Sequence, residues 1–175
     1  MPKWLSNTVK QLLTYQHLLV IVLSLFLIST SGWILMGRAI RTQASIWDLL
    51  HVYLGAMVAC LSVSMLLTNV IKGKWRQYFS WLAGDFTQLS QDVCGLKKGK
   101  IPLAGGRGLF SAIEGIGLIL LLLVSITGAM WYFTQGSSEA LNWRSYHHSA
   151  AHGFIGFIII HSICAAAHLL DFIRN

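Results

Sequence analysis

The sequence is poor in charge. Asp, Glu, Lys and Arg make up 11% of its 175 residues, and hydrophobic residues make up 55%. Soluble globular proteins carry about 25% charged residues, so an ordinary soluble domain is excluded and a membrane protein is indicated.

Cysteine is also scarce, with only Cys60, Cys94 and Cys164 in the chain. Neither a C-x-x-C nor a C-x-x-C-H motif occurs, which excludes a zinc ribbon and a covalently attached c-type haem. Two of the three cysteines lie in apolar segments, where a small buried residue is the simplest interpretation. We expect no disulfide.

Four apolar segments are long enough to cross a bilayer, which needs roughly 20 residues each. They are Leu18–Met36, Leu49–Ile71, Leu109–Phe133 and His147–Phe172. Backbone polar groups in lipid must be satisfied within the segment, so helices are expected. The first run is too long for the core of a secretory signal, so we expect it to be retained. The prediction is an all-α, integral membrane four-helix bundle forming one domain over residues 1–175. Its helices cover about 8–36, 46–71, 109–133 and 144–173.

The net charge of +7 is unevenly distributed, which argues against nucleic-acid binding. Seven cations lie between the second and third segments: Lys72, Lys74, Arg76, Lys97, Lys98, Lys100 and Arg107. The positive-inside rule then makes the loop 73–108 cytoplasmic, together with both termini. Aromatic residues give this loop an apolar side, which predicts a short amphipathic helix in contact with membrane lipid.

Five of the seven histidines lie at or near the last segment, at His147, His148, His152, His161 and His168. Histidine inside a membrane helix indicates a functional site. His147 and His161 are 14 residues apart. That step ends about 40° short of four full turns and rises roughly 21 Å, so both rings leave one helix face near opposite sides of the membrane.

Depth along the helices sorts four histidines into two pairs. His17 and His161 lie roughly 30 Å and 27 Å from the outer ends of their helices. His51 and His147 lie within roughly 9 Å of those ends. The inner pair is therefore His17 with His161, and the outer pair is His51 with His147. His148 is the rival for the outer position.

Two histidine pairs inside a helix bundle suit two b haems, because haem iron accepts axial imidazoles and the ring needs an apolar slot. The alternative is that each histidine makes an interhelical hydrogen bond. Gly55, one turn after His51, leaves room either for a flat macrocycle or for close helix packing.

Three further residues suggest a quinone site near the inner pair. Arg107 follows a glycine-rich turn, Glu114 lies early in the third helix, and His168 lies two turns beyond His161. A carboxylate and an imidazole can supply protons for quinone reduction. The alternatives are that Arg107 binds lipid phosphate, that Glu114 faces water, and that His168 meets a haem propionate or ends the helix.

With these residues the chain resembles the four-helix di-haem cytochrome b family. That family includes nickel–iron hydrogenase cytochrome b, the gamma subunit of formate dehydrogenase and bacterial stand-alone b cytochromes. The resemblance rests on His17, His51, His147 and His161 and on the turn before the third helix. In the formate dehydrogenase branch this turn carries Asn-Ala-Gly-Gln-Lys. Here residues 104–108 read Ala-Gly-Gly-Arg-Gly, so the Asn is missing and Arg107 stands in place of the Gln.

The sequence thus predicts a multi-pass cytochrome b of the bacterial inner membrane, with two b haems and a bound quinone. It would pass electrons between the quinone pool and a periplasmic redox partner. Two alternatives remain open: a stand-alone enzyme similar to superoxide oxidase that reduces quinone, and a non-haem membrane scaffold or transporter.

Overall fold

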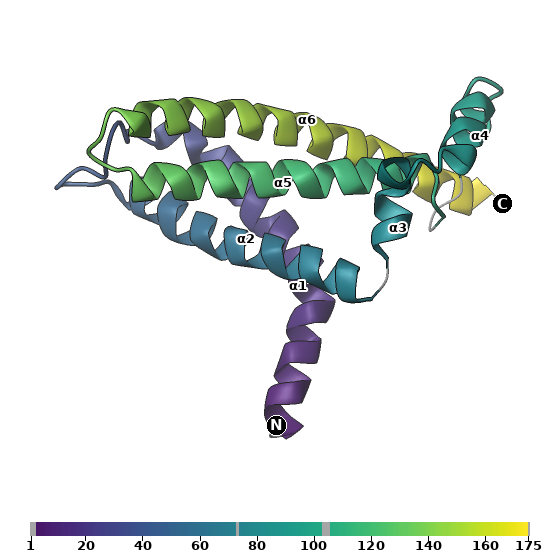
Figure 1. Ribbon diagram of the computed structural model, residues 1–175, viewed down its shortest axis with the longest axis horizontal. Helices are drawn as coiled ribbons and strands as arrows, with labels where there is room; N and C mark the ends of the chain where they lie inside the picture. The colour runs from purple at the N-terminus through teal and green to yellow at the C-terminus, as the bar shows by residue number, and fades with distance from the viewer. Residues whose placement is uncertain (1–2, 73, 103–105, 175) are drawn as a thin grey trace. The chain divides into compact units, whose positions relative to one another are not determined.

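In the computed structural model, the residues described are 3–72, 74–102 and 106–174, and the side chains of 3–14, 171, 172 and 174 are not described. The helices are α1 (Lys3–Thr30), α2 (Ile46–Ile71), α3 (Trp75–Tyr78), α4 (Thr87–Leu96), α5 (Leu109–Phe133) and α6 (Glu139–Arg174). Two 3-10 turns, η1 (Ser31–Trp33) and η2 (Ser80–Ala83), complete the elements in Figure 1. No strand occurs in these ranges, so the predicted all-α class is confirmed.

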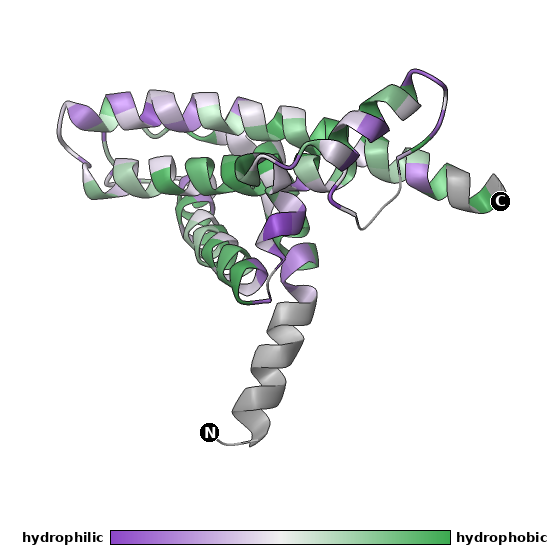
Figure 2. Cartoon of the chain, turned by 45° about the vertical axis from the view of Figure 1, so that its right-hand side comes forward, coloured by the Kyte–Doolittle hydropathy of each residue, from purple (hydrophilic) through white to green (hydrophobic). Residues whose placement is uncertain are grey.

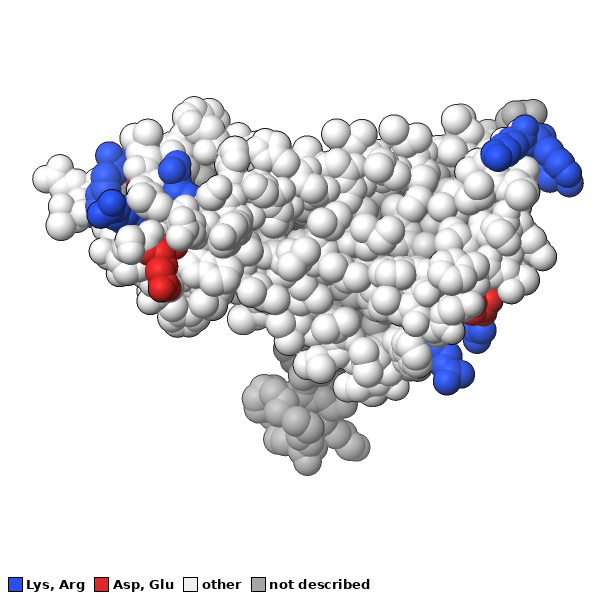
Figure 3. Space-filling model, turned by 45° about the horizontal axis from the view of Figure 1, so that its top comes forward, with Lys and Arg blue, Asp and Glu red and all other residues white. Residues whose placement is uncertain are grey.

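Four stretches of the described chain have the length and hydropathy of membrane spans, namely Tyr15–Trp33, Ile46–Ile71, Leu109–Phe133 and Glu139–Leu170. Their residues are largely apolar, as the green colour in Figure 2 shows, and many large apolar side chains on them are exposed. Most of the face drawn in Figure 3 carries no charged side chain. An apolar exterior on long helices is what lipid requires, so the prediction of four spans is confirmed.

The described residues fall into two compact units. Unit 1 consists of the chain up to Thr68 together with Leu121–Ala151. Unit 2 consists of Asn69–Leu120 and the described residues from His152 onward.

A cluster of Met36, Trp131 and Ala140 forms the buried core at one end of unit 1. The Trp131 indole donates to the Gly37 carbonyl over 3.0 Å. Nearby, Asp48 is fully buried and accepts from the amides of Leu35 and Ser45 at 2.9 and 3.1 Å. Ser45 Oγ accepts from the Asp48 amide in return, which makes a capping box at the start of α2. These bonds fix the connection between α1 and α2.

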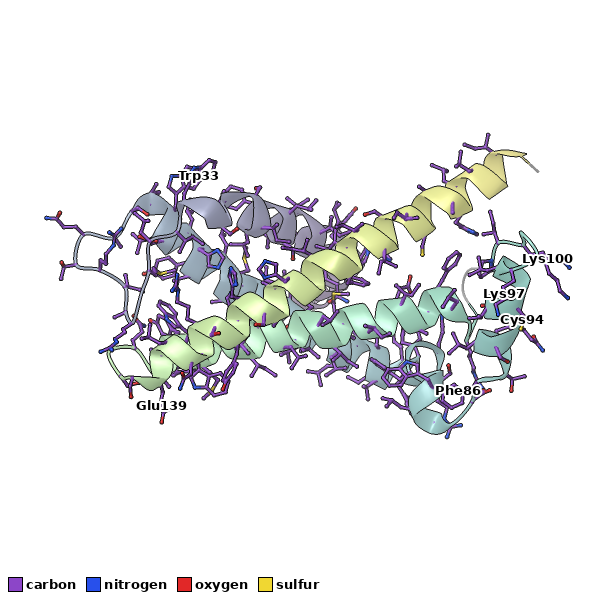
Figure 4. The ribbon with its side chains drawn as sticks, turned by 90° about the horizontal axis from the view of Figure 1, so that it is seen from above. Trp33, Phe86, Cys94, Lys97, Lys100 and Glu139 are labelled. Atoms are coloured by element: carbon purple, nitrogen blue, oxygen red, sulfur yellow. The ribbon has the colours of Figure 1, made fainter. Side chains whose placement is uncertain are left out.

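The first helix ends earlier than its predicted limit of residue 36. Regular α-helix stops at Thr30, tightens into η1 and then leaves the helical conformation at Ile34. The amide of Leu35 bonds to the Asp48 carboxylate and therefore cannot continue the helix. In contrast, α2 and α5 have the predicted limits, and α6 begins at Glu139, five residues before the predicted start. Trp33 and Glu139 are labelled in Figure 4.

The segment between α2 and α5 was predicted as one short amphipathic helix. It instead contains α3, η2 and α4, because Gly84 adopts a left-handed φ of 74° that ends η2. Asp92 of α4 is buried and accepts from the Leu109 amide over 2.8 Å, so it caps the start of α5. A Cβ at Gly108 would overlap the Asp92 carboxylate, so this close approach requires glycine. Leu103, Ala104 and Gly105 of the glycine-rich turn lie outside the described residues.

Candidate haem site

The outer histidine pair lies within unit 1, with His51 on α2 and His147 on α6. Their ring centres are 6.1 Å apart and their planes are nearly perpendicular, at 89°. A metal ion bonded to one nitrogen of each ring at about 2 Å separates two imidazole centres by roughly 6 Å. The distance between the two ring centres is therefore compatible with both imidazoles binding one metal ion.

Helix α5 fixes the orientation of the His147 ring. His147 Nδ1 lies 3.0 Å from the Val124 carbonyl oxygen and 3.4 Å from Thr127 Oγ1. A carbonyl can only accept, so Nδ1 carries the proton and donates it to Val124. The other ring nitrogen then holds a lone pair available to a metal, which is the usual arrangement for a metal-binding histidine.

Two glycines shape the space around the pair. A Cβ at Gly128 would lie 3.2 Å from the His147 ring, so the glycine lets α5 approach this imidazole closely. A Cβ at Gly55, one turn after His51, would meet no atom of the described structure within 4 Å. The open space beside Gly55 is what a flat macrocycle next to His51 needs.

The His51 ring has a buried nitrogen whose hydrogen-bonding need is not met by the described residues. Its Nδ1 is buried, and the part of the chain that the structure describes offers it no hydrogen-bond partner. A buried polar atom without a partner is costly, so its presence points to a bound group or water at this position. Together the ring spacing, the fixed tautomer and the open space fit a haem held by His51 and His147.

The other predicted site residues lie in different surroundings. His148, the rival outer ligand, is exposed. His17 is exposed in unit 1, and His161 is half-buried in unit 2. The inner pair is thus divided between the units, and its pairing remains a prediction.

His161 is held by an aromatic row along α6. Its ring centre is 5.3 Å from that of Phe157, which stacks on Phe154 at 5.7 Å. Phe157 covers Gly117 of α5 so closely that a Cβ there would overlap the ring. The three side chains therefore support one another against α5.

The predicted quinone contacts all lie in unit 2. Arg107 is exposed and pairs with Asp85 at 3.3 Å. The His168 ring centre lies 6.2 Å from that of Phe110. Glu114 is half-buried next to α3, where burial, and then the charge of Glu114, raise the pKa of the Tyr78 phenol.

Sequence reasoning missed Val124, Thr127 and Gly128, which lie against His147, and Asp48, which caps the helix that carries His51. Only Asp48 has a readable signal, because Ser45-x-x-Asp48 has the spacing of a capping box. Val124 acts through its carbonyl, which no side-chain pattern reveals.

An all-helical membrane protein in which the imidazoles of His51 and His147 are spaced for one metal ion fits the b-type cytochrome class. The profile of the family described as prokaryotic cytochrome b561 matches residues 12–171, so the chain belongs to that family. Searches of curated proteins and of solved structures found no match. The family and the four apolar helices fit a multi-pass protein of the bacterial inner membrane that carries haem b and transfers electrons.

Proposed function

We propose that this protein carries electrons across the inner membrane between a periplasmic redox partner and the quinone pool, using two b haems. His51 and His147 would hold the outer haem, and His17 and His161 the inner one. The observation that carries the proposal is the 6.1 Å approach of His51 to His147, with the proton of His147 fixed on Nδ1.

A b haem held by these imidazoles would supply reversible one-electron transfer. The chain's own residues set the conditions for that chemistry. The Val124 carbonyl orients His147 and raises the basicity of its imidazole. The apolar helices exclude water and keep the site in a low-dielectric environment.

The quinone would bind beside the inner pair on the cytoplasmic side. Arg107, Glu114 and His168 are the proposed contacts, and His168 alternatively meets a haem propionate. In this proposal Glu114 and His168 deliver protons from the cytoplasm while electrons arrive from the outer side. Turnover would therefore build a membrane potential.

Haem content tests the proposal directly. A pyridine haemochrome assay of the purified protein should find about two b haems per chain. His17→Ala and His161→Ala should each remove the same haem, whereas His51→Ala and His147→Ala should remove the other. A single haem, or a common spectral loss in His17→Ala and His51→Ala, would refute the assignment.

Quinol-driven haem reduction tests the quinone site. Arg107→Ala, Glu114→Gln and His168→Ala should reduce its rate in variants that keep full haem content. If all three variants react like the parent, the quinone binds elsewhere. Rapid reduction by superoxide without any partner protein would instead favour the stand-alone enzyme. Membership of a cytochrome family leaves the non-haem scaffold or transporter without support.

A further inference from the structure

An open cavity of about 320 Å³ lies in unit 2, in the segment between the second and third spans. Six residues line it: Trp75, Arg76, Ser80, Ala83, Asp85 and Arg107. Its volume is at the lower end of the range for small-molecule sites in proteins, which begins at about 300 Å³. The histidine pairs make no use of it, and of its lining residues only Arg107 is also a proposed quinone contact.

Contacts with the start of α5 hold one wall of the cavity in place. The Tyr78 carbonyl lies so close to Gly115 that a Cβ on this glycine would overlap it. Gln77 Nε2 donates to Ser111 Oγ at 3.4 Å, and Ser80 Oγ donates to the Arg107 carbonyl at 3.2 Å. Because these bonds join α3 and η2 to the α5 end, the cavity is a fixed feature of unit 2.

The lining has the chemistry of a phosphate site. Arg76 and Arg107 bring two guanidinium groups, whose planar donors suit phosphate oxygens. The opposing charge is Asp85, whose bond to Arg107 joins side chains that are 40% and 56% exposed. An exposed pair of this kind is weak, so an anionic ligand can compete for Arg107. Asp92 does not line the cavity, because its carboxylate accepts from the Leu109 amide and from Gln88.

The surroundings favour a lipid as the source of the phosphate. The segment joins Ile71 to Leu109, the ends of two spans, and therefore lies at the membrane surface. Leu82 and Phe86 directly adjoin the lining residues Ala83 and Asp85 in sequence and are 64% and 53% exposed, and Phe86 is labelled in Figure 4. The Trp75 indole in the lining is typical of the membrane interface. A phospholipid meets both the apolar and the cationic part of this surface.

We propose that this cavity binds the phosphate of an anionic phospholipid headgroup between Arg76 and Arg107, with Asp85 as the internal competitor for Arg107. The proposal goes beyond the electron-transfer function and does not depend on it. Arg107 also appears among the proposed quinone contacts, whereas Arg76 does not, so Arg76 reports on the lipid alone.

Native mass spectrometry of the detergent-purified, haem-loaded chain with added phosphatidylglycerol tests the proposal. Arg76→Ala and Arg107→Ala should each weaken retention of one tightly bound lipid by roughly tenfold or more, because each removes a charge-assisted hydrogen bond. Arg76→Lys should restore part of the loss, since lysine keeps the charge but lacks the planar fork. Asp85→Asn should strengthen retention, because it removes the competitor and keeps an acceptor for the Thr87 amide.

Lys97→Ala is the matched control, because it removes one exposed cation from the end of α4 in the same segment (Figure 4). It should retain the lipid as the parent does. Equal loss in Lys97→Ala, or no loss in the two arginine variants, would overturn the proposal. If inorganic phosphate displaced the lipid at millimolar concentration, the lipid assignment would fail in favour of free phosphate. Quinol-driven haem reduction should be unchanged in Arg76→Ala, which separates this test from that of the quinone site.

Discussion

The polar groups of the histidine pair in unit 1 are buried, whereas those of the arginine cavity in unit 2 are exposed. Around His51 and His147, polar atoms are buried, and the Val124 carbonyl positions the His147 ring. Around Arg76 and Arg107, the charges are exposed and are held by one weak pair with Asp85. A buried polar group is costly to leave unpaired, whereas an exposed charge is screened by water and salt. The first site should therefore tolerate almost no change, and the second should respond gradually.

The largest effect should come from the outer histidines. His147→Ala should lower haem content from about two to about one per chain, because it removes the imidazole that α5 holds in place. His148→Ala is the matched control on the next residue and should keep both haems. Pyridine haemochrome spectra of the two variants measure the difference. Haem loss in His148→Ala alone would transfer the ligand role to that residue.

Asp48 should be the next most sensitive position. Asp48→Ala would leave the part-buried amides of Leu35 and Ser45 without their acceptor, at a cost of about 1–3 kcal/mol. Asp48→Asn keeps one acceptor oxygen and should lose less. Thermal unfolding, monitored by haem absorbance, ranks the stability of the parent and the two variants. A melting curve for Asp48→Ala that overlays the parent would show that water replaces the carboxylate.

A substitution at Gly55 distinguishes a haem-binding slot from ordinary helix packing. No described atom lies within 4 Å of a Cβ at this position, so Gly55→Leu should be nearly neutral if the space is not needed. If a haem fills the space, overpacking of about 1–3 kcal/mol should weaken binding of the outer haem by roughly tenfold or more. Haem titration of the apoprotein measures the affinity. Gly136→Leu is unsuitable as a control, because Gly136 has a φ of 83° and a side chain would strain the backbone.

The smallest effect should come from Asp85. The Thr87 amide and hydroxyl, and then Arg107, hold the pKa of this carboxyl below its ordinary value of 3.8. The Asp85 carboxylate therefore contributes its full stabilisation above pH 3.8, the pKa of the unfolded state. This stabilisation is lost as the pH falls through the lower pKa of the folded state. Melting temperatures of the parent and of Asp85→Asn should differ slightly at neutral pH and converge in acid. If the two melting temperatures moved apart as the pH falls, the predicted direction of the pH dependence would be wrong.

The sequence was sufficient for features that depend on local pattern. Apolar length predicted the limits of α2 and α5, and depth along the helices predicted that His51 and His147 would meet. Features that depend on contacts between residues far apart in the chain could not be predicted from the sequence. The early end of α1 follows from the bond between Leu35 and Asp48, and the support of His147 comes from a carbonyl 23 residues away. The inner pair remains a prediction from depth alone.

The bond from the Leu109 amide to Asp92 has a consequence for how the gene can vary. Surface connections usually accept insertions and deletions, because a longer loop costs little entropy. Here Asp92 sets the residue at which α5 begins, and Gly108 must leave room for its carboxylate. A side chain at position 108 would displace the carboxylate that caps α5, so neither Asp92 nor Gly108 can be exchanged alone. Insertions in this connection must therefore leave a glycine directly before Leu109.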